Sequence, residues 1–215
     1  MYIPPPVRAD EKYRDLLTVV ESRQDIPQEW QGTPIECLIM AQNFGWPIQS
    51  TGKPELLIAT CIEFRYALPV PRMYSYVIRR ASGRVIGSEF SVGYTIAQGV
   101  KYLAVIGHND CGMSQLEAKK AGVIEAFVSQ GWPRDAAEQY VAKQATRHAI
   151  ADELLALKEE YIRLRKIFRQ LVVAPLFVCL HDSRFYVPNW VSDPETEKLI
   201  GDGSAVDLEI IDGLP

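Results

Sequence analysis

Short apolar runs alternate with helical segments from residue 54 onward. Three largely apolar runs are typical of buried strands, and they lie at residues 55–61, 74–79 and 100–108. Residues 87–99 separate the second run from the third and predict a helix that ends at Gly99. The side chains of that helix that we expect to face the sheet are Phe90, Tyr94 and Ile96 or Ala97. A strand, a helix and a strand in this order predict a right-handed crossover in a parallel sheet.

The rest of the chain predicts more helices and a last strand region. We expect a helix over residues 113–129, a break at residues 130–135 and one long charged helix over residues 134–169. Residues 174–187 predict one or two further strands, and the acidic tail after them is expected on the surface. The whole pattern indicates a mostly parallel α/β sheet, in which polar residues at the carboxyl ends of the strands gather at one edge and bind ligands.

The first 53 residues differ from this pattern. Residues 8–22 predict a short amphipathic helix with no core of its own. We therefore divide the chain into an arm over residues 1–53, which packs on the core or on a partner subunit, and an α/β domain over residues 54–215 with the acidic tail.

One helix of the arm has clear boundaries, at residues 33–45. Thr33 can cap its start, Pro34 suits its first position, and Gly45 can end it. Cys37 falls on the apolar side of this helix, so we expect it to be buried as a small hydrophobic residue.

Composition excludes several kinds of partner. The 215-residue chain is 47% hydrophobic and 23% charged, which is ordinary for a folded domain with a sizeable core. Its net charge of −4 and its scattered Lys and Arg argue against nucleic acid or an anionic membrane as the main partner. We find neither an apolar run long enough to span a bilayer nor a secretion signal, so a cytoplasmic protein is expected. In that compartment the four cysteines are expected to be thiols or metal ligands.

Three side chains that bind metals are predicted at the same edge of the sheet. Cys61 ends the first predicted strand, His108 ends the third, and Cys111 follows three residues later in a turn. Two thiolates and an imidazole, with a fourth position left for water, are the donors of a catalytic zinc site, whereas structural zinc sites are closed by four protein ligands. A histidine at a strand end is also common without a metal, so the pattern alone leaves a hydrogen-bonded turn open as well.

The residues around these donors resemble the β-class carbonic anhydrases. The motifs of that family are Cys-x-Asp-x-Arg, then Arg-Asn-Ala-Gly, then His-x-x-Cys-Gly. This chain has the segments CIEFR at residues 61–65, RRASG at 79–83 and HNDCG at 108–112, in the same order and with similar spacing. The resemblance is firm over residues 56–113, extends less closely to residue 187, and does not cover the first 50 residues or the tail.

The resemblance implies the fold, the cofactor and the reaction. The implied fold is a four- to five-stranded, mostly parallel sheet flanked by helices, here with an N-terminal helical arm, assembled as a homodimer or tetramer with the site near the subunit interface. The implied reaction is the reversible hydration of CO₂ to bicarbonate by a zinc-bound hydroxide. The implied Zn²⁺ ligands are Cys61, His108 and Cys111. The residues implied to act beside the ion are Glu63 and Arg65 as a dyad that orients the hydroxide, with Arg79 and Gly112 at the substrate.

Several residues depart from the motifs of the family. The dyad acid is Glu63 instead of Asp, and its carboxylate reaches about 1.5 Å farther. Arg80 stands in place of Asn and Ser82 in place of Gly. An additional cation at Arg80 either favours a bound anion or points to solvent, and the bulky Phe64 either narrows the pocket or packs in the core. Asp110 is expected to cap the following helix, with substrate binding as the alternative.

These departures leave three functions open. The first is a carbonic anhydrase, and the second is a related zinc hydrolase of carbonyl sulfide or carbon disulfide. The third is a catalytically weak zinc-binding relative with a role in assembly. Another candidate nucleophile, Cys179 with His181, has neither a base nor an oxyanion hole at a defined spacing, so we expect it to belong to a core strand.

Overall fold

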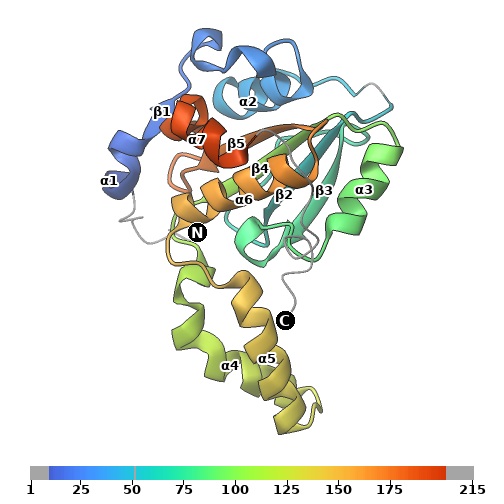
Figure 1. Cartoon of the computed structure of the whole chain (residues 1–215), viewed down its shortest axis with the longest axis vertical. Helices are drawn as coiled ribbons and strands as arrows, with labels where there is room; N and C mark the ends of the chain where they lie inside the picture. Colours follow the sequence, from blue (N-terminus) through green and yellow to red (C-terminus); the bar gives the residue numbers. More distant parts are fainter. Residues whose placement is uncertain (1–9, 51, 202–215) are drawn as a thin grey trace.

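The computed structural model describes residues 10–50 and 52–201, and a six-stranded sheet lies at its centre (Figure 1). The order across the sheet is β1-β6-β5-β4-β2-β3. The strands are β1 (Leu17–Val19), β2 (Leu56–Cys61), β3 (Ser75–Arg80), β4 (Tyr102–His108), β5 (Val172–Val178) and β6 (Phe185–Pro188). Strands β3, β2, β4 and β5 are parallel neighbours, while at the other edge β6 pairs antiparallel with β5 and β1 pairs antiparallel with β6. The mostly parallel α/β sheet is therefore confirmed, with one or two strands more than expected.

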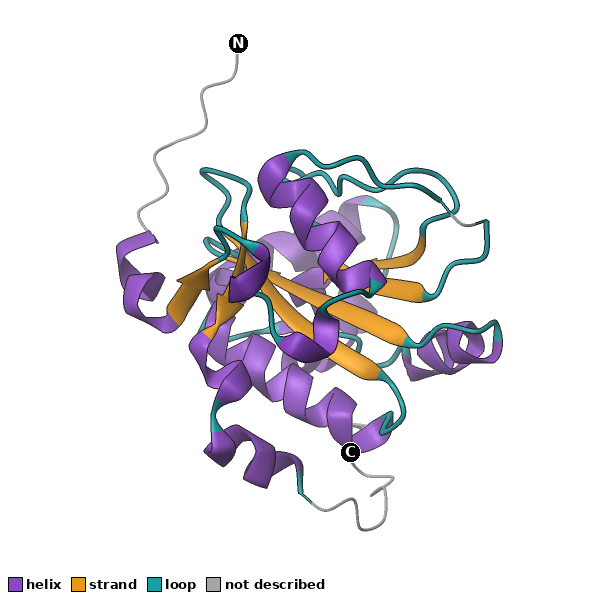
Figure 2. Ribbon diagram, turned by 90° about the horizontal axis from the view of Figure 1, so that it is seen from above, coloured by secondary structure: helices purple, strands orange, loops and turns teal. Residues whose placement is uncertain are grey.

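Helices cover both faces of the sheet (Figure 2). The helices are α1 (Asp10–Tyr13), α2 (Pro34–Phe44), α3 (Glu89–Ala97), α4 (Leu116–Ser129), α5 (Arg134–His148), α6 (Glu153–Ile167) and α7 (Pro194–Ile200). The short 3-10 turns are η1 (Arg14–Leu16), η2 (Arg23–Asp25), η3 (Gln28–Trp30), η4 (Ala81–Gly83), η5 (Gly112–Gln115) and η6 (Asn189–Ser192). Along β2, Leu56 and Ile58 pack with α2, whereas Leu57 and Ala59 pack with α6, because successive strand residues point to opposite faces.

Helix α2 has the boundaries that its sequence predicts. The Thr33 hydroxyl accepts a hydrogen bond from the backbone N–H of Ile35, Pro34 is the first helical residue, and Gly45 ends the helix with a φ of 71°. The prediction for Cys37 was wrong, because this side chain is exposed. The helix buries Ile35, Leu38, Ile39, Met40 and Ala41 instead, which turns Cys37 away from the sheet.

The N-terminal segment joins the sheet instead of forming an amphipathic helix. In the described part of residues 8–22, α1 and η1 are each short, and β1 pairs antiparallel with β6 through Thr18 opposite Val187. The helix prediction was wrong because strand pairing with a segment about 170 residues away is not visible in local periodicity. This strand raises the strand count to six.

Helix α3 buries a different face from the one predicted. Phe90 and Tyr94 are 87% and 57% exposed, and Ile96 and Ala97 are also exposed. Val92 and Thr95 are the buried residues of this helix. The prediction was wrong because it assumed that the largest apolar side chains mark the face against the sheet.

The predicted long helix over residues 134–169 is two helices. The first ends at His148, and Asp152 starts the second, since its carboxylate accepts hydrogen bonds from the backbone N–H groups of Leu154 and Leu155 and caps α6. Helices α4 and α5 form a hairpin that projects from the rest of the molecule (Figure 1). At the tip of the hairpin the rings of Phe127, Trp132 and Tyr140 pack together, with centroids 4.8–5.4 Å apart.

The sequence also led to expectations about the acidic tail and about membrane-spanning helices. Most of the acidic tail, residues 202–215, lies outside the described residues. Among the described residues, no helix is both long enough and apolar enough to cross a membrane.

Candidate metal centre

The fold brings the three predicted metal donors together. Cys61 is the last residue of β2 and His108 the last residue of β4, and both strands run in the same direction. Cys111 follows in the turn before η5. The donor atoms of these three residues all lie within 4.8 Å of one another, and each residue is at most 5% exposed. Two thiolates on one tetrahedral Zn²⁺ ion, each at about 2.3 Å, lie about 3.8 Å apart, so shifts of about 1 Å at most between donor atoms bring this group onto an ion.

The imidazole of His108 is oriented as a ligand. Its Nδ1 lies 2.9 Å from the backbone carbonyl of Asn109, which fixes the proton on Nδ1. The other ring nitrogen, Nε2, is buried and has no hydrogen-bond partner among the described residues. Metal-binding histidines commonly donate one ring N–H to a carbonyl and bind the ion through the other nitrogen. An unsatisfied Nε2 beside two buried sulfur atoms fits a metal ion.

Each of the two thiols shifts the pKa of the other. The hydrogen bond from the Cys111 thiol is the main reason that the pKa of Cys61 is lowered to about 4, and His108 adds to this against the opposing effect of burial. The pKa of Cys111 is raised, first by the neighbouring Cys61 thiolate and then by burial. A bound metal ion removes protons from coordinating thiols, so both sulfurs are poised to become ligands together.

The centre has three protein donors within the described residues. No fourth Cys, His, Asp or Glu of the described chain belongs to the group formed by Cys61, His108 and Cys111. The nearby carboxylate of Glu63 is engaged elsewhere, because Arg65 binds both of its oxygens. Three donors leave one coordination position for water or substrate, which is the arrangement of catalytic zinc sites.

Glu63 and Arg65 form a two-pronged ion pair next to the centre. Arg65 Nε and Nη2 each donate to one oxygen of Glu63 at 2.8 Å. The backbone N–H of Arg65 also donates to Glu63 Oε1 at 2.7 Å, which bends the longer side chain back toward its own backbone. These hydrogen bonds from Arg65 lower the pKa of Glu63 to about 2 despite its burial. The carboxylate is therefore ionised and held in one orientation at neutral pH.

Asp110 has a role that the sequence did not suggest. Its carboxylate accepts a hydrogen bond from Arg65 Nη1 at 2.6 Å, and its backbone carbonyl accepts one from Arg65 Nη2 at 3.0 Å. The expectation that Asp110 caps a helix was wrong, because η5 and α4 begin after Cys111 and Gln115. Asp110 instead links the loop of the second cysteine to the dyad. No local sequence signal pairs the two residues, because Arg65 and Asp110 are 45 positions apart.

The other two residues implied at the substrate lie close to the centre. Arg79, in β3, donates from Nη1 to the backbone carbonyls of Cys61 at 3.2 Å and Glu63 at 3.4 Å, so it holds the segment that carries the dyad. Gly112 directly follows Cys111 at the start of η5.

The turn η4 supports the first cysteine from the neighbouring strand. The backbone N–H of Ser82 donates to the sulfur of Cys61. Ser82 takes a left-handed conformation, with φ at 64°, where glycine is the usual residue. Gly83 lies so near the sheet that a Cβ atom there would be 3.2 Å from the backbone nitrogen of Cys61.

The structure excludes one of the two alternatives for Phe64 and one of the two for Arg80. Phe64 is 83% exposed and does not pack in the core; its ring lies 5.9 Å from the Arg65 guanidinium carbon. Arg80 is half-buried and donates from Nη1 to the Ser88 hydroxyl, so it does not simply extend into solvent. Arg147 also lies near Gly87, and the guanidinium groups of Arg80 and Arg147 are both 3.7 Å from the position of a Cβ on that glycine.

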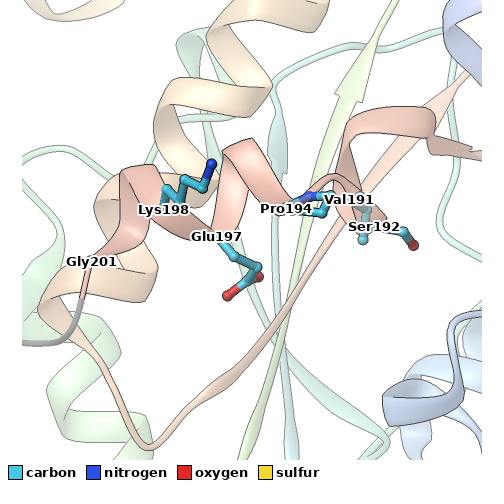
Figure 3. A pocket seen from close by; sticks show the side chains of 6 residues that line it. All are labelled: Val191, Ser192, Pro194, Glu197, Lys198 and Gly201. Carbon is cyan, nitrogen blue, oxygen red and sulfur yellow. The ribbon is translucent and has the colours of Figure 1, made fainter.

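Two other regions are weaker candidates. A groove of about 760 Å³ runs along α7 and is lined by Val191, Ser192, Pro194, Glu197, Lys198 and Gly201 (Figure 3). Its two charged residues already have partners, since Glu197 pairs with Arg165 and Lys198 with Glu195. The turn that contains Cys179 and His181 follows β5, so the core-strand prediction was wrong in detail, although Cys179 is buried.

Comparison with known proteins shows the fold. No protein-family model and no curated protein matches the sequence. A β-carbonic anhydrase of Trichomonas vaginalis has a similar structure, with a TM-score of 0.55 and 17% identity over 76% of this chain and 99% of that one. A carbonic anhydrase of Streptococcus mutans has a TM-score of 0.50 and 18% identity over 76% of this chain and 100% of that one. A carbon disulfide hydrolase has a TM-score of 0.47 and 19% identity over 80% of this chain and 95% of that one, and a TM-score this low supports no inference.

Proposed function

We propose that this chain, which has the fold of the β-class carbonic anhydrases, is a zinc-dependent carbonic anhydrase that converts CO₂ and water reversibly to bicarbonate. One observation carries the proposal. Two buried thiols and an imidazole with an unsatisfied Nε2 converge from two strand ends beside a carboxylate that Arg65 holds by two hydrogen bonds.

The ligands in this proposal are Cys61, His108 and Cys111. A Zn²⁺ ion held by such a set lowers the pKa of a bound water molecule from about 15.7 to near 7, which makes a nucleophile available at neutral pH. The protein holds its donors in place through hydrogen bonds from the backbone, namely from Ser82 to Cys61 and from Met113 to Cys111. N–H groups that point at the sulfurs reduce the charge that the thiolates donate to the ion, which favours ionisation of the water.

Glu63 orients the attacking water in this proposal. Its carboxylate is ionised and can accept a hydrogen bond, and Arg65 prevents it from turning onto the ion and closing the fourth position. The hydrogen bond from the Arg65 backbone N–H draws the Glu63 carboxylate back and so partly offsets the extra length of this side chain. The carboxylate can therefore serve where the family has Asp, although an error of about 1 Å in its position is enough to lower the rate by about 100-fold.

We also propose that the chain forms a homodimer or tetramer through the β3 edge of the sheet. Strand β3 has no neighbour on its outer side among the described residues. Large apolar side chains are exposed on this strand, on the loops that flank it and on α3, and they are Ile62, Phe64, Met73, Val77, Phe90 and Tyr94. Exposed apolar surface beside an open strand edge favours association, and a second copy would cover Phe64 next to the dyad.

A reducing compartment suits the centre. Cys61 and Cys111 lie close together and must remain thiols to bind an ion. The cytoplasm keeps thiols reduced, so we place the protein there.

The test measures metal and activity on the same preparations. Protein purified with added zinc and reductant should contain one Zn²⁺ per chain by elemental analysis and should hydrate CO₂ in a stopped-flow indicator assay. Cys61→Ser and His108→Ala should lose stoichiometric zinc, and Arg65→Gln should keep zinc but lose most of the activity. Stoichiometric zinc in Cys61→Ser or His108→Ala would contradict the ligand set.

The same assay separates the alternatives. Glu63→Asp restores the residue of the family and serves as the matched variant. A zinc-loaded protein that is inert toward CO₂ while Glu63→Asp is active would indicate the catalytically weak relative. The hydrolase would be indicated if both proteins were inactive toward CO₂ and the unmodified chain released sulfide from carbonyl sulfide or carbon disulfide.

A further inference from the structure

The N-terminal arm reaches the metal centre through a buried tyrosine. Tyr13, in α1, is 1% exposed, and its ring packs against Phe177 of β5 with centroids 5.1 Å apart. Its hydroxyl donates a hydrogen bond to Glu153 Oε2 and lies 3.3 Å from Asp152 Oδ2. The aromatic ring thus anchors α1 on the sheet, while the hydroxyl reaches the first residues of α6.

The opposite side of the same carboxylate holds the loop of the second cysteine. Glu153 Oε1 accepts a hydrogen bond from the backbone N–H of Cys111 at 3.2 Å. The side chain of Glu153 is 10% exposed, so this bond forms largely away from solvent. One carboxylate therefore connects the arm with a metal donor that is separated from Tyr13 by 98 positions in the sequence.

Further contacts fix the segment that carries Glu153. Lys12, also in α1, forms ion pairs with Asp152 and, at 3.5 Å, with Glu153. On the other side of the segment, the backbone N–H of Ile150 donates to the carbonyl of Met113 at 3.3 Å. Ile150 also packs in a small apolar cluster with Cys61 and Cys111. The segment from Ile150 to Glu153 lies between the arm and the loop and touches both.

The loop needs such support because of its backbone conformation. Asp110 has a φ of 52°, in the left-handed region, and a non-glycine residue keeps that conformation only where its surroundings hold it. Without Glu153, the N–H of Cys111 would lose its acceptor in a buried site. The loop would then sample other conformations, and the ion would have to order Cys111 when it binds.

We propose that Tyr13 and Glu153 are positioning residues that hold Cys111 in the geometry required for the metal ion. The inference depends on the proposed metal centre and assigns to the arm a role at that centre. Neither residue is a ligand. Glu153 acts through the Cys111 N–H, and Tyr13 acts through Glu153.

The experiment measures zinc affinity by competition with a chromophoric chelator at fixed pH and salt. Loss of an outer partner of a metal ligand typically lowers metal affinity by about 10- to 100-fold. Glu153→Ala should fall in that range, and Tyr13→Phe, which keeps the ring on Phe177, should lose about 10-fold. Glu153→Gln should remain within about threefold of the unmodified chain, since its amide oxygen still accepts from Cys111 and its amide N–H₂ can donate to the Tyr13 oxygen.

A matched control and a double variant separate positioning from general destabilisation. Tyr161→Phe also removes a hydroxyl from a tyrosine that is 1% exposed, but this hydroxyl accepts from Arg165 and does not contact the loop, so zinc affinity should not change. Tyr13→Phe combined with Glu153→Ala should bind zinc no more weakly than Glu153→Ala alone, because Tyr13 acts through Glu153.

The outcomes distinguish this inference from the proposed centre. Failure of the unmodified chain to bind zinc would overturn the centre itself. The positioning role alone would be overturned if the unmodified chain bound zinc tightly and stoichiometrically and if Tyr13→Phe, Glu153→Ala and Tyr161→Phe all bound zinc with the same affinity. Additive losses in the double variant would show that Tyr13 does not act through Glu153.

Discussion

Glu160 offers the sharpest test of how this fold is held together. It is fully buried in α6, and its carboxylate accepts three hydrogen bonds. These come from the backbone N–H of Val85 at 2.7 Å and from Arg163 Nε and Nη2 at 2.9 and 2.7 Å. Arg84 Nε lies 3.6 Å away. The carboxylate thus joins α6 to the segment that follows η4, the turn that supports Cys61.

Glu160→Ala should destabilise the protein severely. The substitution leaves the Val85 N–H and the Arg84 side chain without this acceptor in a buried site, while Arg163 keeps its bond to Glu89. Removing one partner of a buried ion pair costs about 3–5 kcal/mol, because an uncompensated charge remains away from water. A loss of this size is a large part of the total stability of a typical domain.

A surface pair provides the control. Glu125 binds Arg134 through two hydrogen bonds, as Glu160 binds Arg163, but both side chains are more than half exposed. Water screens that pair, so Glu125→Ala should lose far less stability than Glu160→Ala. The free energy of unfolding is measured in urea at pH 7 for all three proteins. Equal losses in the two variants would refute the reasoning that burial decides the strength of these pairs.

Three further predictions concern the centre and the assembly. Gly83→Ala should lower the free energy of unfolding by about 1–3 kcal/mol in urea, because φ is +73° and a Cβ would be 3.2 Å from the Cys61 nitrogen; unchanged stability would contradict this close packing. Arg65 keeps the pKa of Glu63 below its ordinary value near 4.5, so the ionised pair adds stability above pH 4.5 that is lost as the pH falls toward about 2. Arg65→Gln should remove that part of the pH dependence in chelator-treated protein, and an unchanged pH profile would argue against the pair. Phe90→Glu should reduce the mass measured by light scattering to that of the monomer, and an unaltered oligomer would exclude α3 from the interface.

Local signals predicted the elements that carry the site. Buried strands of a parallel sheet are visible in the sequence as apolar runs. The sequence therefore predicted where β2 and β4 end, and that Cys61 and His108 stand at those ends. The ends of α2 were also predictable, because a cap and a terminal glycine act on their own backbone. Strand direction then implied that the donors meet, since parallel strands present their carboxyl ends at one edge.

Only the tertiary structure decided which partner each of the remaining side chains meets. Phe90 is as apolar as a core residue yet exposed, since the neighbours of α3 lie on its other face. Asp110 pairs with Arg65, and Tyr13 reaches Glu153 across 140 positions. Periodicity and motifs reflect local interactions within one segment. These contacts, in contrast, depend on distances between segments, which are fixed only when the whole chain packs.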